Sequence, residues 1–320
     1  MSDKSAPKPL NLMEYHRPKR IKLTDARIPP LSAESRRCLK NLAAYRPRKP
    51  RFPYPRERSA AVLVALFVGR LGDLYVLLNR RSSTLRSYAG DTSLPGGKVD
   101  PEDRTIEDTA RREAFEEIGL PHNKLKVPLL CVLSPFLATN QLIVTPVVVL
   151  ILDNTLRLHL YSHTLSHPSC RRHHPFPSES ELVEVPYHTT SDGAYPGPNG
   201  KMFPTRAHRF LTGREAGGIK PVFGLTAAIM IKAASIAHAP RLPEFEVSPP
   251  GAQSPEARIA WAVYSNPDFR DAYAREGVHV SWNTVARVAG VKDAKEDIRH
   301  GQTKSFHRDN NRRRMLRSKL

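Results

Sequence analysis

Hydrophobic residues along this chain are grouped in patterns typical of the strands of a layered fold. Residues 59–68 read SAAVLVALFV, a nearly continuous apolar run of strand length, and such a run is typical of a strand buried on both faces. Residues 126–133 and 142–152 are similarly apolar. Shorter strands are predicted at residues 74–78, around Thr92 and at residues 206–211. The sequence therefore predicts a mixed sheet.

Helical segments lie between and around these strands. Residues 32–45 have a helical pattern that Ser32 can cap, and residues 105–118 have helical composition with Gly119 in place for a C-cap. Residues 222–237 are mainly apolar, as expected for a helix packed on a sheet. Three shorter helices are predicted near the end of the chain, at residues 258–264, 268–275 and 282–289. We expect an α/β fold in which helices flank a mixed sheet, with an added N-terminal helix and a small C-terminal helical extension.

The helix predicted at residues 105–118 carries an unusual set of acids. Glu113, Glu116 and Glu117 are spaced i, i+3 and i+4, so their carboxylates share one face and repel one another. A bound divalent cation reverses that repulsion, and Mg²⁺ commonly bridges carboxylates to substrate phosphates. The tight turn at residues 95–97, Pro-Gly-Gly, brings bare backbone near the same place. For such a cluster taken alone, the alternative is a solvated acidic face.

The chain has a strong positive charge. Its 320 residues have a formal net charge of +19, and basic residues concentrate at residues 18–22, 46–58 and 299–319. Such charge suits nucleic acid or an anionic small substrate, and a solvated basic surface is a third alternative. The basic runs lack interleaved aromatic residues and a known binding motif, so nucleic-acid binding is the disfavoured interpretation.

Cysteine usage and hydropathy exclude several other classes. The three cysteines form no CxxC pair, so neither a disulfide framework nor a zinc site is indicated. No apolar run is long enough to span a membrane, and the first residues lack the apolar core of a secretory signal. We therefore expect no membrane span.

The composition divides the chain into four parts. We expect residues 1–31 to be disordered, 32–58 to be the N-terminal helix and a linker, 59–238 to be the main domain with an irregular insertion at 153–200, and 239–320 to be the C-terminal extension. The insertion carries His159, His163, His167, Cys170, His173 and His174. Their spacings fit no familiar metal site, so a surface insertion is favoured, and a local error in the sequence is the alternative.

The acidic helix resembles a known motif. Gly97, followed by residues 112–120 (REAFEEIGL), is similar to the signature of Nudix hydrolases, which cleave a nucleoside diphosphate linked to another group. The resemblance implies a Nudix-type α/β/α sandwich and an Mg²⁺ or Mn²⁺ cofactor held by Glu113, Glu116 and Glu117, with Arg112 orienting these acids. Two features depart from the commonest signature: the spacing from Gly97 to Arg112 is one residue longer, and Arg104 stands where a first glutamate is usual.

A second motif narrows the expected substrate. Residues 77–103 (LLNRRSSTLRSYAGDTSLPGGKVDPED) resemble the stretch found in coenzyme A diphosphatases of this family, in which the longer spacing also occurs; the overall arrangement looks most like fungal peroxisomal members. The resemblance implies hydrolysis of coenzyme A, or its acyl or oxidised derivatives, to 3′,5′-ADP and 4′-phosphopantetheine or its derivative. Substrate-binding residues are then expected to be Arg81, Leu85, Arg86, Gly96, Gly97 and Lys98.

The chain's last residues, Ser318-Lys319-Leu320, match a peroxisomal address read by an import receptor. We therefore expect the peroxisome, and otherwise the cytoplasm. The general base is expected to be one of the box glutamates or a later acid, with Glu181 and Glu184 as candidates. Two alternatives stay open: a Nudix hydrolase of another substrate (an oxidised nucleotide, a dinucleotide or capped RNA), and a basic nucleic-acid-binding or inactive scaffold.

Overall fold

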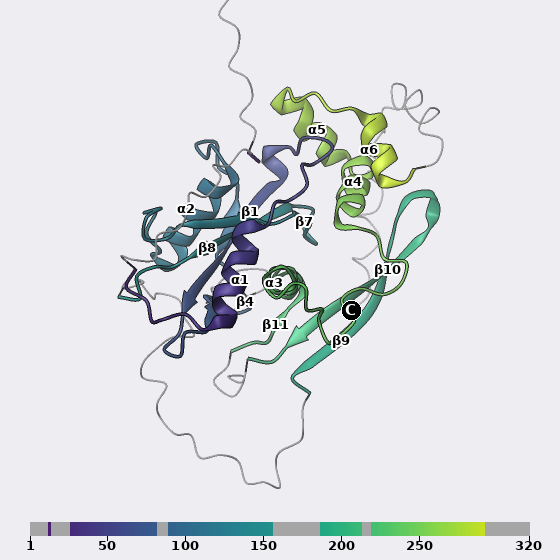
Figure 1. Cartoon of the computed structure of the whole chain (residues 1–320). Coiled ribbons are helices and arrows are strands. Elements are labelled where there is room, and N and C mark those ends of the chain that lie inside the picture. Colours follow the sequence, from purple (N-terminus) through teal and green to yellow (C-terminus); the bar gives the residue numbers. More distant parts are fainter. Residues whose placement is uncertain (1–11, 14–25, 82–88, 156–185, 213–218, 292–320) are drawn as a thin grey trace, which may run out of the picture.

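The computed structural model describes residues 12–13, 26–81, 89–155, 186–212 and 219–291 (Figure 1). The helices within these ranges are α1 (Ala33–Ala44), α2 (Ile106–Ile118), α3 (Gly224–Ala237), α4 (Pro255–Ser265), α5 (Pro267–Glu276) and α6 (Trp282–Ala289). The strands are β1 (Ser59–Val68), β2 (Leu74–Val76), β3 (Asn79–Arg80), β4 (Thr92–Ser93), β5 (Gly96–Lys98), β6 (Leu129–Val132), β7 (Phe136–Leu137), β8 (Ile143–Leu150), β9 (His188–Pro196), β10 (Met202–Phe210) and β11 (Val222–Phe223).

The main sheet is mixed, as the sequence predicted. Its order is β2-β1-β8-β6, with β5 paired to β1 and β7 paired to β8. The long central strands β1 and β8 run parallel, from Ser59 opposite Ile143 to Leu66 opposite Leu150. The other pairings are antiparallel. A parallel pair needs a long crossover, and α2 lies in the chain that supplies it.

Helices cover both faces of this sheet (Figure 1). Alternate residues of β1 point to opposite faces, so Leu63 packs in one cluster with Ala110 and Ala114 of α2. Val64 points the other way and joins a cluster with residues of α1 and α3. The predicted α/β/α sandwich is therefore confirmed, and α2 is held against the sheet by its apolar face.

Local signals that fix the ends of the helices explain where α1 and α2 begin. The Ser32 side chain accepts a hydrogen bond from the Ser35 N–H at the start of α1. Thr105 and Asp108 form a reciprocal capping box at the start of α2, and Gly119 ends α2 at a φ of 69°. Such caps satisfy backbone groups that the helix itself leaves unpaired.

The sequence analysis was wrong about part of the insertion at residues 153–200. Residues 188–196 form the strand β9, which pairs along its whole length with β10 in a separate three-stranded sheet of order β11-β10-β9. The strand reads HTTSDGAYP and is mostly exposed, so it lacks the alternation that a half-buried strand shows. The five histidines and the cysteine named above for the insertion lie outside the described residues, whereas His188 begins β9.

Two residues of the N-terminal segment form hydrogen bonds to the main domain. The carbonyl of Leu12, a residue only 7% exposed, accepts a hydrogen bond from the N–H of Ile106 at 2.9 Å. The N–H of Arg27 donates to the carbonyl of Leu152 at 2.8 Å. Leu12 and Arg27 therefore contact the main domain, and the disorder expected for residues 1–31 stays a prediction.

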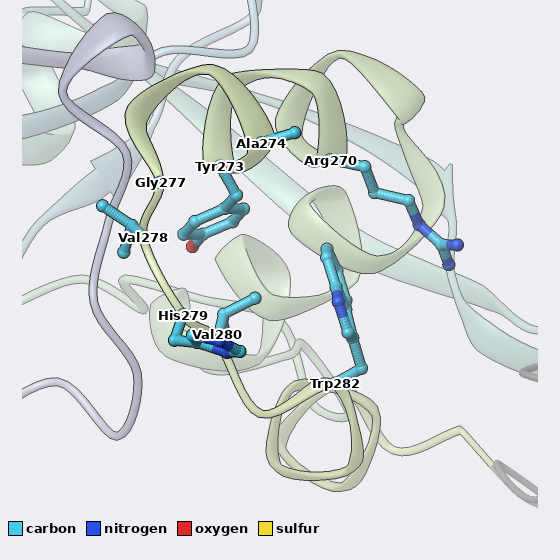
Figure 2. Close-up of a pocket in the computed structure, with 8 residues that line it drawn as sticks. All are labelled: Arg270, Tyr273, Ala274, Gly277, Val278, His279, Val280 and Trp282. Carbon is cyan, nitrogen blue, oxygen red and sulfur yellow. The ribbon is translucent and has the colours of Figure 1, made fainter.

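The three predicted C-terminal helices are present and pack together on the main domain. Ile259 of α4 and Phe269 of α5 share a cluster with Ile143, the first residue of β8. A hollow of about 540 Å³ opens on these helices, and Figure 2 shows Tyr273 and Trp282 among its lining residues. The guanidinium of Arg270 lies 4.8 Å from the Trp282 ring centroid. None of the predicted site residues that the structure describes lines this hollow.

None of the helices in the described ranges is long and apolar enough to cross a membrane.

Candidate active site

The three glutamates lie on the side of α2 that its apolar residues leave free. Ala114 and Ile118 are fully buried under the helix. Glu113 is only 17% exposed at its side chain, and Glu116 is 54% exposed. Glu117 is partly buried. The three acids therefore share one face of α2, but they differ in how far their side chains are exposed to solvent.

Arg112 binds two of these acids. Its Nη1 donates to Glu113 Oε1 at 3.0 Å and to Glu116 Oε2 at 3.3 Å. Its Nη2 also donates to the Lys98 carbonyl at 2.9 Å, which joins α2 to β5. These contacts hold Glu113 and Glu116 at one guanidinium, and the orienting role of Arg112 stays a prediction.

Asp103 anchors Arg112, and the sequence analysis did not assign it that role. Arg112 Nε and Nη2 donate to the two carboxylate oxygens of Asp103 at 3.2 and 3.0 Å. Burial raises the pKa of Asp103, but the bonds from Arg112 and from the Asp100 N–H outweigh it and hold the pKa below its ordinary value. Arg104, which stands at the usual glutamate position, is exposed. The sequence hinted at this acid, because Asp103 immediately precedes Arg104 within the longer spacing before Arg112.

Glu117 is held by donors that come from outside its helix. Asn79 Nδ2 donates to Glu117 Oε2 at 2.6 Å, and the Gly96 N–H donates to the same oxygen at 3.3 Å. Burial, and then the charge of Glu113, raise the pKa of Glu117 to about 7. Asn79 also went unassigned in the sequence analysis, although it lies in the second motif.

Glu113 has a raised pKa for related reasons. Burial is the largest cause, and the charges of Glu116 and Asp100 add to it, while Arg112 acts in the opposite direction. Burial is thus the main reason that both carboxylates resist ionisation, and the charges of neighbouring acids add to it. A bound cation would favour the ionised form of both groups.

The two glycines of the turn are required by close packing. A Cβ on Gly97 would lie 2.3 Å from Glu113 Oε1, so the absent side chain makes room for that carboxylate. Gly96 has a φ of 158°, and a Cβ there would lie 2.3 Å from the Ala61 carbonyl oxygen. The close approach seen here is to the protein's own groups, and the approach of this backbone to a ligand stays a prediction.

The structure describes some of the predicted substrate-binding residues and omits others. Arg81 lies close enough to Glu117 for its charge to lower the pKa of that carboxyl, and its own buried Nε has no hydrogen-bond partner within the described ranges. Lys98 is exposed on β5. Leu85, Arg86, Glu181, Glu184 and the segment Ser318-Lys319-Leu320 lie outside the described residues.

The donor chemistry of this face fits a hard divalent cation, although the carboxylates form no closed cage. Among the described residues, no three histidine, cysteine, aspartate or glutamate side chains surround one point closely enough to hold a metal ion. Arg112 draws Glu113 and Glu116 toward itself, while Asn79 holds Glu117. Mg²⁺ usually takes one or two carboxylates together with waters and substrate phosphates, so an open, partial set of ligands suits it.

Comparison with known proteins agrees with this arrangement. Residues 56–198 match the NUDIX domain, and this range contains the sheet, α2 and the three glutamates. The match thus falls on the part of the chain that forms the candidate active site.

The relatives of known name share only parts of the chain. The "Peroxisomal coenzyme A diphosphatase 1, peroxisomal" of Saccharomyces cerevisiae is 48% identical over 93 residues, which are 28% of this chain and 27% of that protein. The "Nudix hydrolase 15, mitochondrial" of Arabidopsis thaliana is 33% identical over 198 residues, 57% of this chain and 60% of its own length. The chain thus spans less than two thirds of either relative.

A solved structure gives a weaker likeness. The crystal structure of a Nudix hydrolase from M. smegmatis aligns with 35% of this chain and 71% of its own, at 23% identity and a TM-score of 0.27.

Proposed function

We propose that this protein hydrolyses the diphosphate bond of coenzyme A or of its acyl or oxidised derivatives. The products are 3′,5′-ADP and 4′-phosphopantetheine or its derivative. The observation that carries the proposal is the contact of Asn79 and Gly96, both within the motif at residues 77–103, with Glu117 of the acidic helix. The motif that suggests the substrate and the helix that suggests the chemistry thus form one site.

The reaction requires a water oxygen to bond to one phosphorus while the bridging P–O bond breaks. Glu113, Glu116 and Glu117 would hold Mg²⁺ or Mn²⁺. When bound, the ion neutralises the diphosphate and lowers the pKa of water. Arg112 keeps Glu113 and Glu116 in place. Phosphoryl-type transfer depends mainly on positioning and charge stabilisation, so the chain needs no covalent nucleophile.

The proton released by the water needs an acceptor on the protein. The candidates remain a box glutamate and the later acids Glu181 and Glu184. Arg81 supplies positive charge beside Glu117, Lys98 is exposed on the neighbouring strand β5, and arginine is suited to bidentate contacts with phosphate. Their charge supports an anionic substrate over a neutral one.

The proposal is tested by presenting several substrates side by side to the purified chain with Mg²⁺ and with Mn²⁺. We expect coenzyme A or an acyl-coenzyme A to be cleaved faster than an oxidised nucleotide, a dinucleotide or capped RNA. A clear preference for one of those nucleotides would overturn the substrate and retain the NUDIX chemistry. No hydrolysis of any of them would favour the scaffold alternative, which a salt-dependent affinity for nucleic acid would support.

The place of action stays a separate prediction. The names of three relatives include the words peroxisomal, chloroplastic and mitochondrial. The peroxisomal expectation rests on Ser318-Lys319-Leu320 and on one of these names.

A further inference from the structure

A two-stranded ladder next to the active site has no evident role in the sandwich itself. The strands β3 and β4 pair with each other, apart from the main sheet. Asn79 stands opposite Ser93, and Arg80 stands opposite Thr92. Side chains of directly opposed residues lie on the same side of a ladder. Asn79 and Ser93 therefore form a cross-strand pair.

This pair continues to Glu117 through a chain of short hydrogen bonds. Ser93 Oγ donates to Asn79 Oδ1 at 2.6 Å, and Asn79 Nδ2 donates to Glu117 Oε2 at 2.6 Å. Asn79 is only 5% exposed. Because its oxygen already accepts from Ser93, its amide nitrogen is the end that faces the carboxylate, and the orientation of Asn79 is fixed from both sides.

The described residues that donate to Glu117 meet one of its oxygens only. The Gly96 N–H donates to Oε2 at 3.3 Å, as Asn79 does at 2.6 Å. Neither donor meets Oε1. A carboxylate held in this way cannot rotate freely, so Oε1 has a defined direction.

We propose that Asn79 and Ser93 are positioning residues that commit Oε2 of Glu117 to the protein and present Oε1 to the divalent cation. The inference rests on the metal-dependent chemistry proposed above, and it adds residues that touch neither substrate nor metal. The upstream motif then has a role beyond binding substrate, because its ladder sets the geometry of a glutamate that lies 38 residues further along the chain.

The pair is needed because the helix alone does not hold Glu117. Arg112 contacts Glu113 and Glu116, and the like charges of the three acids push Glu117 away from them. Partners that orient a metal ligand typically contribute about 10–100-fold to metal affinity or activity. We expect a loss in that range when Asn79 is removed.

The test measures Mn²⁺ binding to the full chain by calorimetry, without any substrate. Asn79→Ala should weaken Mn²⁺ binding about 10- to 100-fold and lower kcat with little change in KM. Ser93→Ala should weaken Mn²⁺ binding several-fold, and Ser93→Thr, which keeps the hydroxyl, should restore it. The matched control is Thr92→Val: Thr92 lies in the same ladder, but its Oγ1 donates to the Lys220 carbonyl at 2.5 Å. Loss of the Thr92 hydroxyl should leave Mn²⁺ affinity unchanged.

Two results would overturn the inference. The first is a folded Asn79→Ala variant that binds Mn²⁺ as tightly as the wild type. The second is that Ser93→Ala and Ser93→Thr bind Mn²⁺ with equal affinity. Should Asn79→Ala fail to fold, the serine pair decides alone. Binding of Mn²⁺ that depends on Asn79, without cleavage of coenzyme A, would refute the proposed substrate and leave this inference standing.

Discussion

Replacement of Glu117 by glutamine should make the metal-free protein more stable. Glutamine removes the charge and keeps an oxygen that can accept from Asn79 Nδ2 and the Gly96 N–H. The pKa of Glu117 is raised to about 7 from 4.5 because burial and Glu113 disfavour the charged form. The folded state therefore binds this proton more tightly than the unfolded state, so the ionised carboxylate opposes folding.

The size of the effect follows from proton linkage. A group whose pKa is raised on folding stabilises the fold at pH values below its unfolded-state pKa. That stability is lost as the pH rises through its folded-state pKa. For a shift from 4.5 to about 7, the penalty relative to the neutral form is roughly 3 kcal/mol at pH 8.5 and roughly 1 kcal/mol at pH 5.5. These are upper limits, because Glu117 is partly solvated and glutamine accepts weaker hydrogen bonds.

Thermal unfolding in EDTA at the two pH values tests this reasoning. The Glu117→Gln variant should melt a few degrees above the wild type at pH 8.5, and the difference should shrink at pH 5.5. Glu116→Gln is the matched control, because Glu116 is 54% exposed and surface substitutions usually change stability by less than about 0.5 kcal/mol. A lower melting temperature for Glu117→Gln at pH 8.5, or a difference that does not depend on pH, would refute the account.

Further changes test other contacts of the site. Asp103→Asn removes the charged anchor of Arg112 and should lower kcat about 10- to 100-fold while the melting temperature falls. Steady-state kinetics and thermal unfolding check both effects, and an unchanged kcat would argue against Asp103 as the anchor. Gly97→Ala places a Cβ 2.3 Å from Glu113 Oε1 and should weaken Mn²⁺ binding, measured by calorimetry. Gly193→Ala is its control, since a Cβ there meets only Thr205 Cγ2 at 3.9 Å; equal Mn²⁺ affinities in the two variants would contradict the proposed crowding.

The elements that form the sandwich were largely predictable because burial decides them. The strand at residues 59–68 and the helix at 105–118 match β1 and α2 within a residue. Apolar runs and capping residues indicate such elements directly. The strand predicted at 126–133 is shorter in the structure, Leu129–Val132, and residues 222–223 form β11 rather than the first turn of α3.

The elements that the sequence did not reveal are stabilised by pairing rather than by a buried face. The strand β9 has polar, exposed residues and exists through its hydrogen bonds to β10. Leu12 is buried although the residues around it are rich in proline and lysine, because it meets the start of α2. Neither partner is near in sequence, so no local pattern indicates them.

The candidate site likewise contains residues that the local sequence indicates and residues that only the folded chain brings together. Spacing along one helix predicted that Glu113, Glu116 and Glu117 share a face, and the resemblance pointed to Arg112. The partners that hold these residues, Asp103 and Asn79, depend on how separate segments meet in space. Arg104 stands where a glutamate is usual in the signature, and the structure supplies an acid from Asp103, one position earlier.

Mass spectrometry of the products formed from coenzyme A by the purified chain, with Mg²⁺ or Mn²⁺, tests the central claim most directly. The account predicts 3′,5′-ADP and 4′-phosphopantetheine, with loss of both products in EDTA. Intact coenzyme A, under conditions in which the same preparation cleaves an oxidised nucleotide or a dinucleotide, would contradict it.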